Sequence, residues 1–145
     1  MMRPDCPETY PRRVLLAVSG LTPQVVTETL YALAMRKVPF VPTEVHIITT
    51  DLGRQRFVAS FQHFREFFRE YDLPMPRCDA GDVHAIAGAN GRSTDVRTPA
   101  DNEEVANLIM RTVLDLTSDP ECAVHASIAG GRKTMGFYLG YLMSM

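Results

Sequence analysis

The sequence predicts an α/β fold, in which a mostly parallel, Rossmann-like sheet is flanked by helices. Short apolar runs such as Val14–Val18 and Val45–Thr49 are bounded by turn residues, which is typical of strands buried on both faces. A segment with apolar residues three or four positions apart, typical of an amphipathic helix, follows each run. Strands that alternate with helices in this way pair in parallel, because each helix carries the chain back across the sheet.

The first strand and helix are predicted from residues 14–37. The strand is the run Val14–Val18, and Ser19 and Gly20 end it. Thr22 is predicted to cap the following helix, because a threonine hydroxyl accepts hydrogen bonds from free helix amides and proline suits the first helical position. The apolar face of this helix contains Val26, Leu30, Leu33 and Ala34.

The second strand, Val45–Thr49, is followed by a predicted turn at residues 50–53 and one long amphipathic helix over residues 54–71. Aromatic side chains recur on this helix at helical spacing: Phe57, Phe61, Phe64, Phe68 and Tyr71. Such a stripe is more typical of a core or a dimer seam than of a ligand site.

The remaining elements are less regular. Val83–Ile86 is a weak third strand, and residues 87–100 form a long polar loop, which is often functional inside a compact domain. Asp101 or Asn102 is predicted to cap a helix that ends near Thr117. A strand over residues 122–129, a turn at residues 130–131 and a last helix complete the pattern.

Length and composition indicate one domain over residues 1–145, with an extended lead-in at residues 1–13. Hydrophobic residues make up 46% of the chain, which is enough for one core. The chain stops at Met145 inside an apolar helical pattern, so we expect a truncated C-terminus. An effector, or the remaining part of the fold, is expected after it.

The cysteines and the N-terminus indicate the compartment. Cys6, Cys78 and Cys122 are widely spaced and form no CxxC pair, which indicates a reducing environment. The first residues contain no apolar signal core, and no apolar run approaches the about 20 residues needed to span a bilayer. We therefore expect a soluble, cytoplasmic protein without a membrane segment.

Charge and motif spacing exclude several functional classes. A formal net charge of −2 and a pI of about 6.1 argue against a protein that coats long nucleic acid. The four histidines lack the spacing of metal ligands, so no metal is expected. No GxGxxG follows the first strand, so no dinucleotide cofactor is expected either. Arg132 stands directly before Lys133, where a triphosphate-binding P-loop requires glycine.

Two strand-end turns nevertheless favour an anion. Gly130 and Gly131 let a ligand approach the backbone, and the predicted helix after them offers free amides at its positive end. Arg132 and Lys133 add charge, and Thr134 adds a hydroxyl. The first turn offers the neutral hydrogen-bonding groups of Ser19, Thr22 and Gln24. This combination suits a phosphodiester or a base edge better than a metal; the alternative is a tight turn with solvated charges.

The two motifs VSGLTPQVVTETLYAL and SIAGGRKTMGFYLGY together resemble the CARF domain, the CRISPR-associated Rossmann fold of type III CRISPR systems. The resemblance runs from Val14 to Met145 and is closest to a subfamily with the SGLTPQ…GGRKTM signature. It implies a homodimeric sensor that binds cyclic oligoadenylate in a pocket across the two-fold axis. Cyclic tetra-adenylate is the expected ring, and cyclic hexa-adenylate is the second choice.

The resemblance also implies the site residues. The first motif contributes Ser19, Gly20, Thr22 and Gln24, and the last contributes Gly130, Gly131, Arg132, Lys133 and Thr134. Lys133 is the expected phosphate contact, whereas Thr50 and Asp51 are expected to reach the adenine edge. Further pocket candidates on or after the long loop are Asn90, Arg92, Asp101 and Asn102.

Two other functions remain open. Some CARF domains cleave their ligand without a metal, by attack of the ribose 2′-OH on the adjacent phosphate; here Lys133 would stabilise charge and Ser19 would orient the reacting groups. No histidine lies in either motif to act as a base, so such turnover is expected to be slow and pure sensing is favoured. The third possibility is an α/β enzyme acting on a mononucleotide or phosphosugar.

Overall fold

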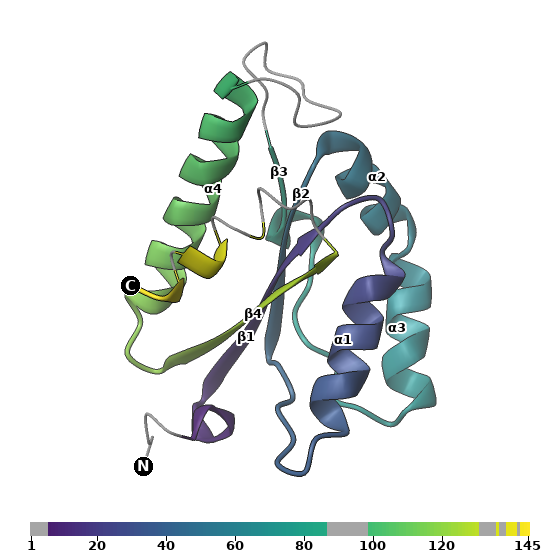
Figure 1. The fold of residues 1–145 in the computed structure, drawn as a ribbon. Coiled ribbons are helices and arrows are strands. Elements are labelled where there is room, and N and C mark those ends of the chain that lie inside the picture. The colour runs from purple at the N-terminus through teal and green to yellow at the C-terminus, as the bar shows by residue number, and fades with distance from the viewer. Residues whose placement is uncertain (1–5, 87–98, 131–135, 137–138, 142) are drawn as a thin grey trace.

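A computed structural model describes residues 6–86, 99–130, 136, 139–141 and 143–145 of the chain (Figure 1). Within these residues the strands are β1 (Arg12–Ser19), β2 (Glu44–Thr49), β3 (Val83–Ala85) and β4 (Cys122–Gly130). They form one sheet in the order β3-β2-β1-β4, and every pairing is parallel. The predicted α/β class with a Rossmann-like parallel sheet is therefore confirmed.

The helices cover both faces of the sheet. Figure 1 shows α1 (Gln24–Ala34), α2 (Asp51–Ala59) and α3 (Phe61–Glu70) on one side, and α4 (Pro99–Thr117) on the other. The short 3-10 helices η1 (Pro7–Thr9) and η2 (Ala80–Asp82) precede β1 and β3. Because the chain moves outward from β1 to β3 and then returns to β4, the direction of winding reverses between β1 and β4.

The central strands β1 and β2 contribute alternate side chains to two cores, which explains why their sequences are continuous apolar runs. In β1, Leu15 and Ala17 pack with the layer of α1, α2 and α3. Val14, Leu16 and Val18 pack instead with α4 and Leu139. Phe57, Phe64 and Phe68 of the aromatic stripe are buried in the first core, as the core interpretation of that stripe predicted.

The pairing of β1 with β4 is irregular near its carboxyl end. Ala17 pairs with Ser127 and Ser19 pairs with Gly130, so β4 contains one residue more than β1 between these pairs. An extra residue of this kind bends a strand locally and often lies beside a functional site. The irregularity falls just before the Gly-Gly-Arg-Lys motif.

Several predicted boundaries are wrong in detail. The predicted helix over residues 54–71 is two helices, because Ser60 leaves the helical conformation and its hydroxyl donates to the Phe57 carbonyl at 2.7 Å. The helix also starts earlier, so residues 51–53 are its first turn and not a separate turn. Thr22 does not cap α1; Pro23 occupies the cap position, with no side-chain cap.

The two ends of the third crossover also differ from expectation. α4 starts at Pro99, so Asp101 and Asn102 lie within its first turns and neither caps it. Proline is well suited to a helix start, since its missing amide would have no helical partner there. At the N-terminus, the lead-in assigned to residues 1–13 is shorter than expected, because β1 begins at Arg12.

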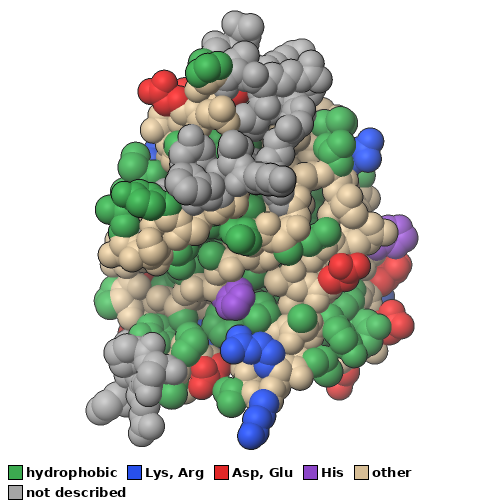
Figure 2. Space-filling model, viewed as in Figure 1, with side chains coloured by type: hydrophobic (Ala, Val, Ile, Leu, Met, Phe, Trp, Pro, Cys, Tyr) green, Lys and Arg blue, Asp and Glu red, His purple; other side chains and the backbone are tan. Residues whose placement is uncertain are grey.

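Some apolar side chains remain exposed on the face that carries β4 and α4 (Figure 2). Ile128 of β4 is 57% exposed, and Leu114 of α4 and Tyr141 are 59% exposed. Figure 2 shows hydrophobic side chains along the edge of this view formed by α4. No helix in the described part of the chain is both long and apolar enough to cross a membrane. The exposed side chains are candidates for contact with another molecule.

Candidate functional site

The carboxyl ends of β1, β2 and β4 are joined by hydrogen bonds. The Gly20 amide donates to the Gly130 carbonyl at 2.7 Å. The Thr49 hydroxyl, at the end of β2, donates to the Gly20 carbonyl at 3.2 Å. Gly20 and Gly130 belong to the two motifs that the sequence singled out, so the fold brings these motifs together although they are far apart in the chain.

This meeting point is the position where a ligand is most expected in such a fold. β1 and β4 are adjacent; α1, which follows β1, lies on one face of the sheet, and Leu139, which follows β4 in the chain, is buried with α4 on the other face. Connections that leave in opposite directions open a crevice beyond the strand ends, and open α/β sheets bind ligands in that crevice. Residues 131–134 directly follow Gly130 in the sequence.

Small residues allow the strand-end turns to pack closely. A Cβ atom on Gly20 would lie 3.2 Å from the Gly130 oxygen, and one on Gly130 would lie 3.1 Å from Cγ1 of Val25. A Cβ on Gly53, in the first turn of α2, would lie 2.7 Å from the Gly20 oxygen and would overlap Thr49. The backbone arrangement at this edge therefore requires glycine at Gly53 and leaves little space at the other two.

Hydroxyl groups line the same edge. Ser19, Thr49 and Thr50 are all buried, with 3%, 1% and 6% exposure. The Thr50 hydroxyl accepts a hydrogen bond from the Gly53 amide at 3.1 Å and so caps α2. Asp51 follows in the first turn, where its carboxylate complements the positive end of the helix. Asp51 would repel a phosphate placed directly on this helix end, which makes a donor such as a base amino group a better neighbour.

Thr50→Ala is expected to reduce the free energy of unfolding by about 1 kcal/mol, because one amide of α2 loses its cap. Chemical denaturation measures this change. Thr27→Ala is the matched control, since the Thr27 hydroxyl donates to Gln24 within α1 and caps nothing. An equal loss in both variants would contradict the capping role.

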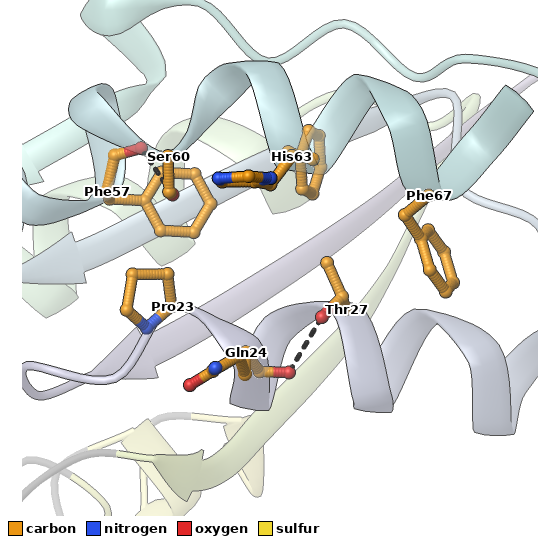
Figure 3. A pocket seen from close by; sticks show the side chains of 8 residues that line it. Pro23, Gln24, Thr27, Phe57, Ser60, His63 and Phe67 are labelled. Carbon is orange, nitrogen blue, oxygen red and sulfur yellow. Dashed lines mark hydrogen bonds between the residues drawn. The ribbon is translucent and has the colours of Figure 1, made fainter.

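The remaining predicted site residues lie in different parts of the chain, and several fall outside the described residues. Thr22 is exposed, and Gln24 is one of the residues that line a groove of about 270 Å³ between α1 and the α2–α3 pair (Figure 3). In α4, Asp101 is buried, and the Asn102 side-chain oxygen is buried with no hydrogen-bond partner among the described residues. Outside the described residues lie Asn90, Arg92, Gly131, Arg132, Lys133 and Thr134.

A comparison with protein families shows the family to which the chain belongs. The model of a family described as CRISPR-associated protein NE0113 (Cas_NE0113) matches residues 22–145. The chain belongs to this CRISPR-associated family. The match covers α1, the carboxyl ends of β2 and β4, and all of the Gly-Gly-Arg-Lys motif. A search of curated proteins found no match.

Membership of Cas_NE0113 indicates a role in CRISPR systems, which agrees with the coarser part of the sequence-based prediction. Sequence reasoning missed two residues of the edge. Thr49 is predicted to end the second strand and Gly53 to lie in the turn after it, and neither is a predicted site residue, whereas both pack against Gly20. Their signal was available: a hydroxyl ends a buried strand, and a glycine follows four residues later.

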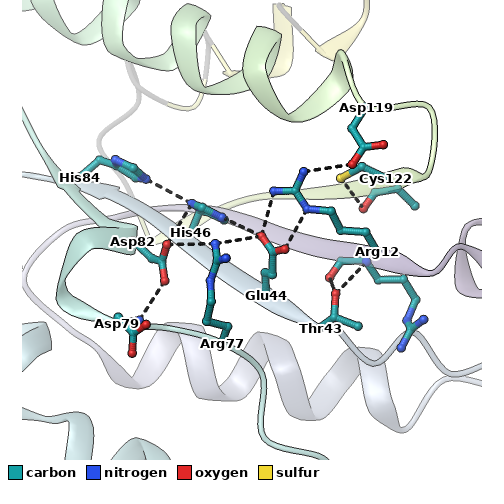
Figure 4. Close-up of polar contacts among 12 residues, drawn as sticks. Arg12, Thr43, Glu44, His46, Arg77, Asp79, Asp82, His84, Asp119 and Cys122 are labelled. Carbon is teal, nitrogen blue, oxygen red and sulfur yellow. Dashed lines mark hydrogen bonds and ion pairs between the residues drawn. The ribbon is translucent and has the colours of Figure 1, made fainter.

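Sequence reasoning also missed a polar network at the amino half of the sheet (Figure 4). Glu44 is its centre: Arg12 donates to both carboxylate oxygens, at 2.8 and 3.0 Å. Arg77 and His46 approach the second oxygen at 3.2 and 3.1 Å. Arg12 also donates to Asp119 at 3.3 Å, so the network ties β1 and β2 to the turn before β4.

Burial and charged partners shift the pKa values of several residues in this network. The hydrogen bonds from Arg12 lower the pKa of Glu44 to about 2, although burial opposes the shift. The same pairing raises the pKa of Arg12 above its ordinary value. Burial lowers the pKa of His84, and the nearby His46 lowers it further. Glu44 is therefore a carboxylate throughout the physiological range of pH.

Proposed function

We propose that the chain is a CARF domain that senses cyclic oligoadenylate in type III CRISPR signalling. One observation carries the proposal: the hydrogen bond from Gly20 to Gly130 joins the two sequence motifs at the point where winding of the sheet reverses. The family match to CRISPR-associated proteins supports the biological setting. The favoured ligand is cyclic tetra-adenylate, and its binding regulates a fused or associated effector.

The chemistry of the edge suits such a ligand. A cyclic oligoadenylate presents phosphodiester groups and adenine edges together. Glycines at the strand ends let a ligand approach the backbone, and Ser19, Thr49 and Thr50 supply hydroxyls there. Arg132 and Lys133, which follow Gly130 in the sequence, would supply positive charge to this edge. Asn102, whose buried oxygen has no partner among the described residues, is suited to accept a hydrogen bond from an amino group.

The proposed ligand has two-fold symmetry, which suits a site shared by two copies of the chain. In an isologous dimer each copy contributes the same residues, so a ring with an even number of adenylates meets two equal half-sites. The exposed apolar side chains on β4 and α4 offer surface for contact with the second copy. One ring per two chains is the expected stoichiometry.

Calorimetric titration with cyclic tetra-adenylate tests the proposal. Lys133→Ala is expected to weaken binding at least about tenfold, because a hydrogen bond from a charged group to phosphate contributes about 1.5–3 kcal/mol. Lys37→Ala removes the only other lysine, which is exposed after α1, and is expected to bind as wild type does. If the wild-type chain gives no heat with either the tetra- or the hexa-adenylate ring, the proposal is wrong.

The same mixture distinguishes sensing from ring cleavage. After incubation, chromatography is expected to recover the ring intact. A linear product formed without metal, and lost in Ser19→Ala and Lys133→Ala, would make the chain a ring nuclease instead. Binding of a mononucleotide by a monomer, with no response to the rings, would support the α/β enzyme alternative.

A further inference from the structure

Two histidine rings meet end to end in the interior of the polar network. His46 Nδ1 in β2 lies 3.2 Å from His84 Nε2 in β3, and the ring planes differ by 10°. The ring centroids are 5.5 Å apart, much farther than the two nitrogens, so the nitrogens point at one another along the line between the rings. This geometry is that of an N–H···N hydrogen bond, which contains one proton.

Glu44 fixes the proton on the other side of His46. His46 Nε2 lies 3.1 Å from Glu44 Oε2, and Glu44 is a carboxylate that can only accept. His46 Nε2 must therefore carry hydrogen. When His46 is neutral, its Nδ1 accepts from His84 Nε2–H; when His46 is cationic, its Nδ1–H donates to a neutral His84. Both states keep the bond between the strands.

A third state breaks this bond. If both rings are cationic, two N–H groups face each other across 3.2 Å, and neither can accept. Two like charges would also repel each other within the network. We propose that the His46–His84 pair is a proton-operated lock, which joins β3 to β2 while the pair holds at most one extra proton and releases β3 when it takes up a second.

The charges around the pair favour one extra proton but not two. Asp82 of η2 lies 3.9 Å from His46 Nδ1, and Arg77 donates to both Glu44 and Asp82. The charged partners are thus Arg12, Arg77, Glu44, Asp82 and Asp119, which sum to −1. One imidazolium neutralises this set, and a second leaves it positive.

Two further charged side chains near the pair offset each other: Arg54 donates to the Val83 carbonyl, next to His84, at 3.1 Å, and Asp79 caps η2 beside Asp82. Burial raises the pKa of the Cys78 thiol to about 12, so Cys78 stays neutral beside Asp82. On the face of α4 that packs over the sheet, Asp101 at its N-terminal end is the one acidic residue among the buried side chains. The number of protons that the two histidines hold therefore depends on the charged residues of the polar network.

The lock acts on a short strand, which Arg54 of α2 also holds through the Val83 carbonyl at 3.1 Å. β3 has only three residues, paired Ile47–Val83, Ile48–His84 and Thr49–Ala85. Directly after it, the Ile86 amide donates to the Thr49 carbonyl at 2.8 Å. Thr49 is also the residue whose hydroxyl holds Gly20. Release of β3 would thus also disturb the hydrogen bonds at the carboxyl edge of the sheet.

The direction of the pH effect follows from the state that the fold prefers. The pKa of His84 is lowered in the folded chain, first by burial and then by the charge of His46. The folded state therefore disfavours the second proton. The attachment of β3 is complete above about pH 6.5, the pKa of an unfolded histidine, and weakens as pH falls below it.

Amide hydrogen exchange followed by NMR tests the lock at single residues. The protection factor of the Ile86 amide, corrected for the intrinsic exchange rate, is expected to fall severalfold between pH 7.5 and pH 5. The Gly20 amide, which bonds across β1 and β4 at the same edge, is the internal reference and should change less. This local readout also avoids the contribution of His125 in β4, whose pKa burial also lowers.

Two variants separate the lock from a general effect of acid. His84→Gln keeps an amide that can donate to His46 but cannot take up a proton, so the Ile86 protection factor should no longer fall with pH. His63→Gln removes a histidine that is 85% exposed, and it should respond as wild type does. An unchanged fall in His84→Gln would overturn the proposal.

If His84→Gln does not fold, the ring nitrogens of the wild-type chain decide the matter. ¹⁵N chemical shifts are expected to show His46 Nε2 protonated throughout the titration, and one shared proton between His46 Nδ1 and His84 Nε2 at neutral pH. A bare His46 Nε2, or two rings that protonate independently with ordinary pKa values, would exclude the lock.

Discussion

Gly53→Ala is expected to lower the free energy of unfolding by about 3 kcal/mol, the upper end of the usual cost of overpacking. The added methyl group would lie 2.7 Å from the Gly20 carbonyl oxygen and would overlap the Thr49 side chain. Thr49 is buried and held by its bond to Gly20, and a backbone oxygen cannot rotate away. α2 must therefore move outward, which separates it from the edge of the sheet. Urea denaturation measures the loss.

Gly81→Ala is the matched control for this variant. A Cβ on Gly81 meets nothing within 4 Å, so the same substitution is expected to be neutral or slightly stabilising, because alanine restricts the unfolded chain. If both variants lose the same stability, the packing of Gly53 against Gly20 is not what limits substitution. In the folded fraction of Gly53→Ala, weaker binding of cyclic tetra-adenylate is also expected, since the strand-end turns are displaced.

The main features of the fold could be predicted because each has a local signal. Continuous apolar runs identified β1 and β2, and their alternation with helical segments identified the parallel sheet. The carboxyl edge followed from the fold class, since parallel strands end on the same side. The contact between Gly20 and Gly130 agrees with that expectation.

The features that could not be predicted depend on partners distant in sequence. The break between α2 and α3 depends on the backbone of Ser60, where the helical spacing of aromatic residues continues without interruption. Glu44, His46 and His84 gave no recognisable motif, because their significance comes from register: β2 and β3 place His46 and His84 on the same face of adjacent strands. Periodicity reports burial, whereas a polar network depends on which strands are neighbours.

β2 connects the two polar regions of the molecule. Its first half carries Glu44 and His46, and its end carries Thr49, with Thr50 capping the helix that follows. Because the contacts of Glu44 fix the start of β2, they also help to keep its carboxyl end in register with β1, where Val18 pairs with Ile48. The network at the amino half therefore contributes to the geometry of the candidate site, although it makes no hydrogen bond with Ser19, Gly20, Thr49, Thr50 or Gly130.

Glu44→Gln is expected to lower the free energy of unfolding at pH 7 by about 2 kcal/mol. Three cationic or protonated groups donate to this carboxylate, and breaking such a cluster leaves charges without an acceptor. Glutamine can still accept from one arginine, and Arg77 is largely exposed, so the loss is smaller than for a fully buried pair. Chemical denaturation at several pH values measures it.

The pH dependence of the free energy of unfolding is a more specific test of the Glu44 charge than the loss at pH 7. The pKa of Glu44 falls from 4.5 to about 2 on folding, so its contribution is complete above about pH 4.5 and disappears as pH falls toward 2. The wild-type chain should lose stability in this window, and Glu44→Gln should lose less there, so the two curves converge in acid. Glu28→Gln removes the same charge from an exposed position on α1 and should follow wild type. Parallel curves for wild type and Glu44→Gln would mean that the network does not stabilise the sheet through the charge of Glu44.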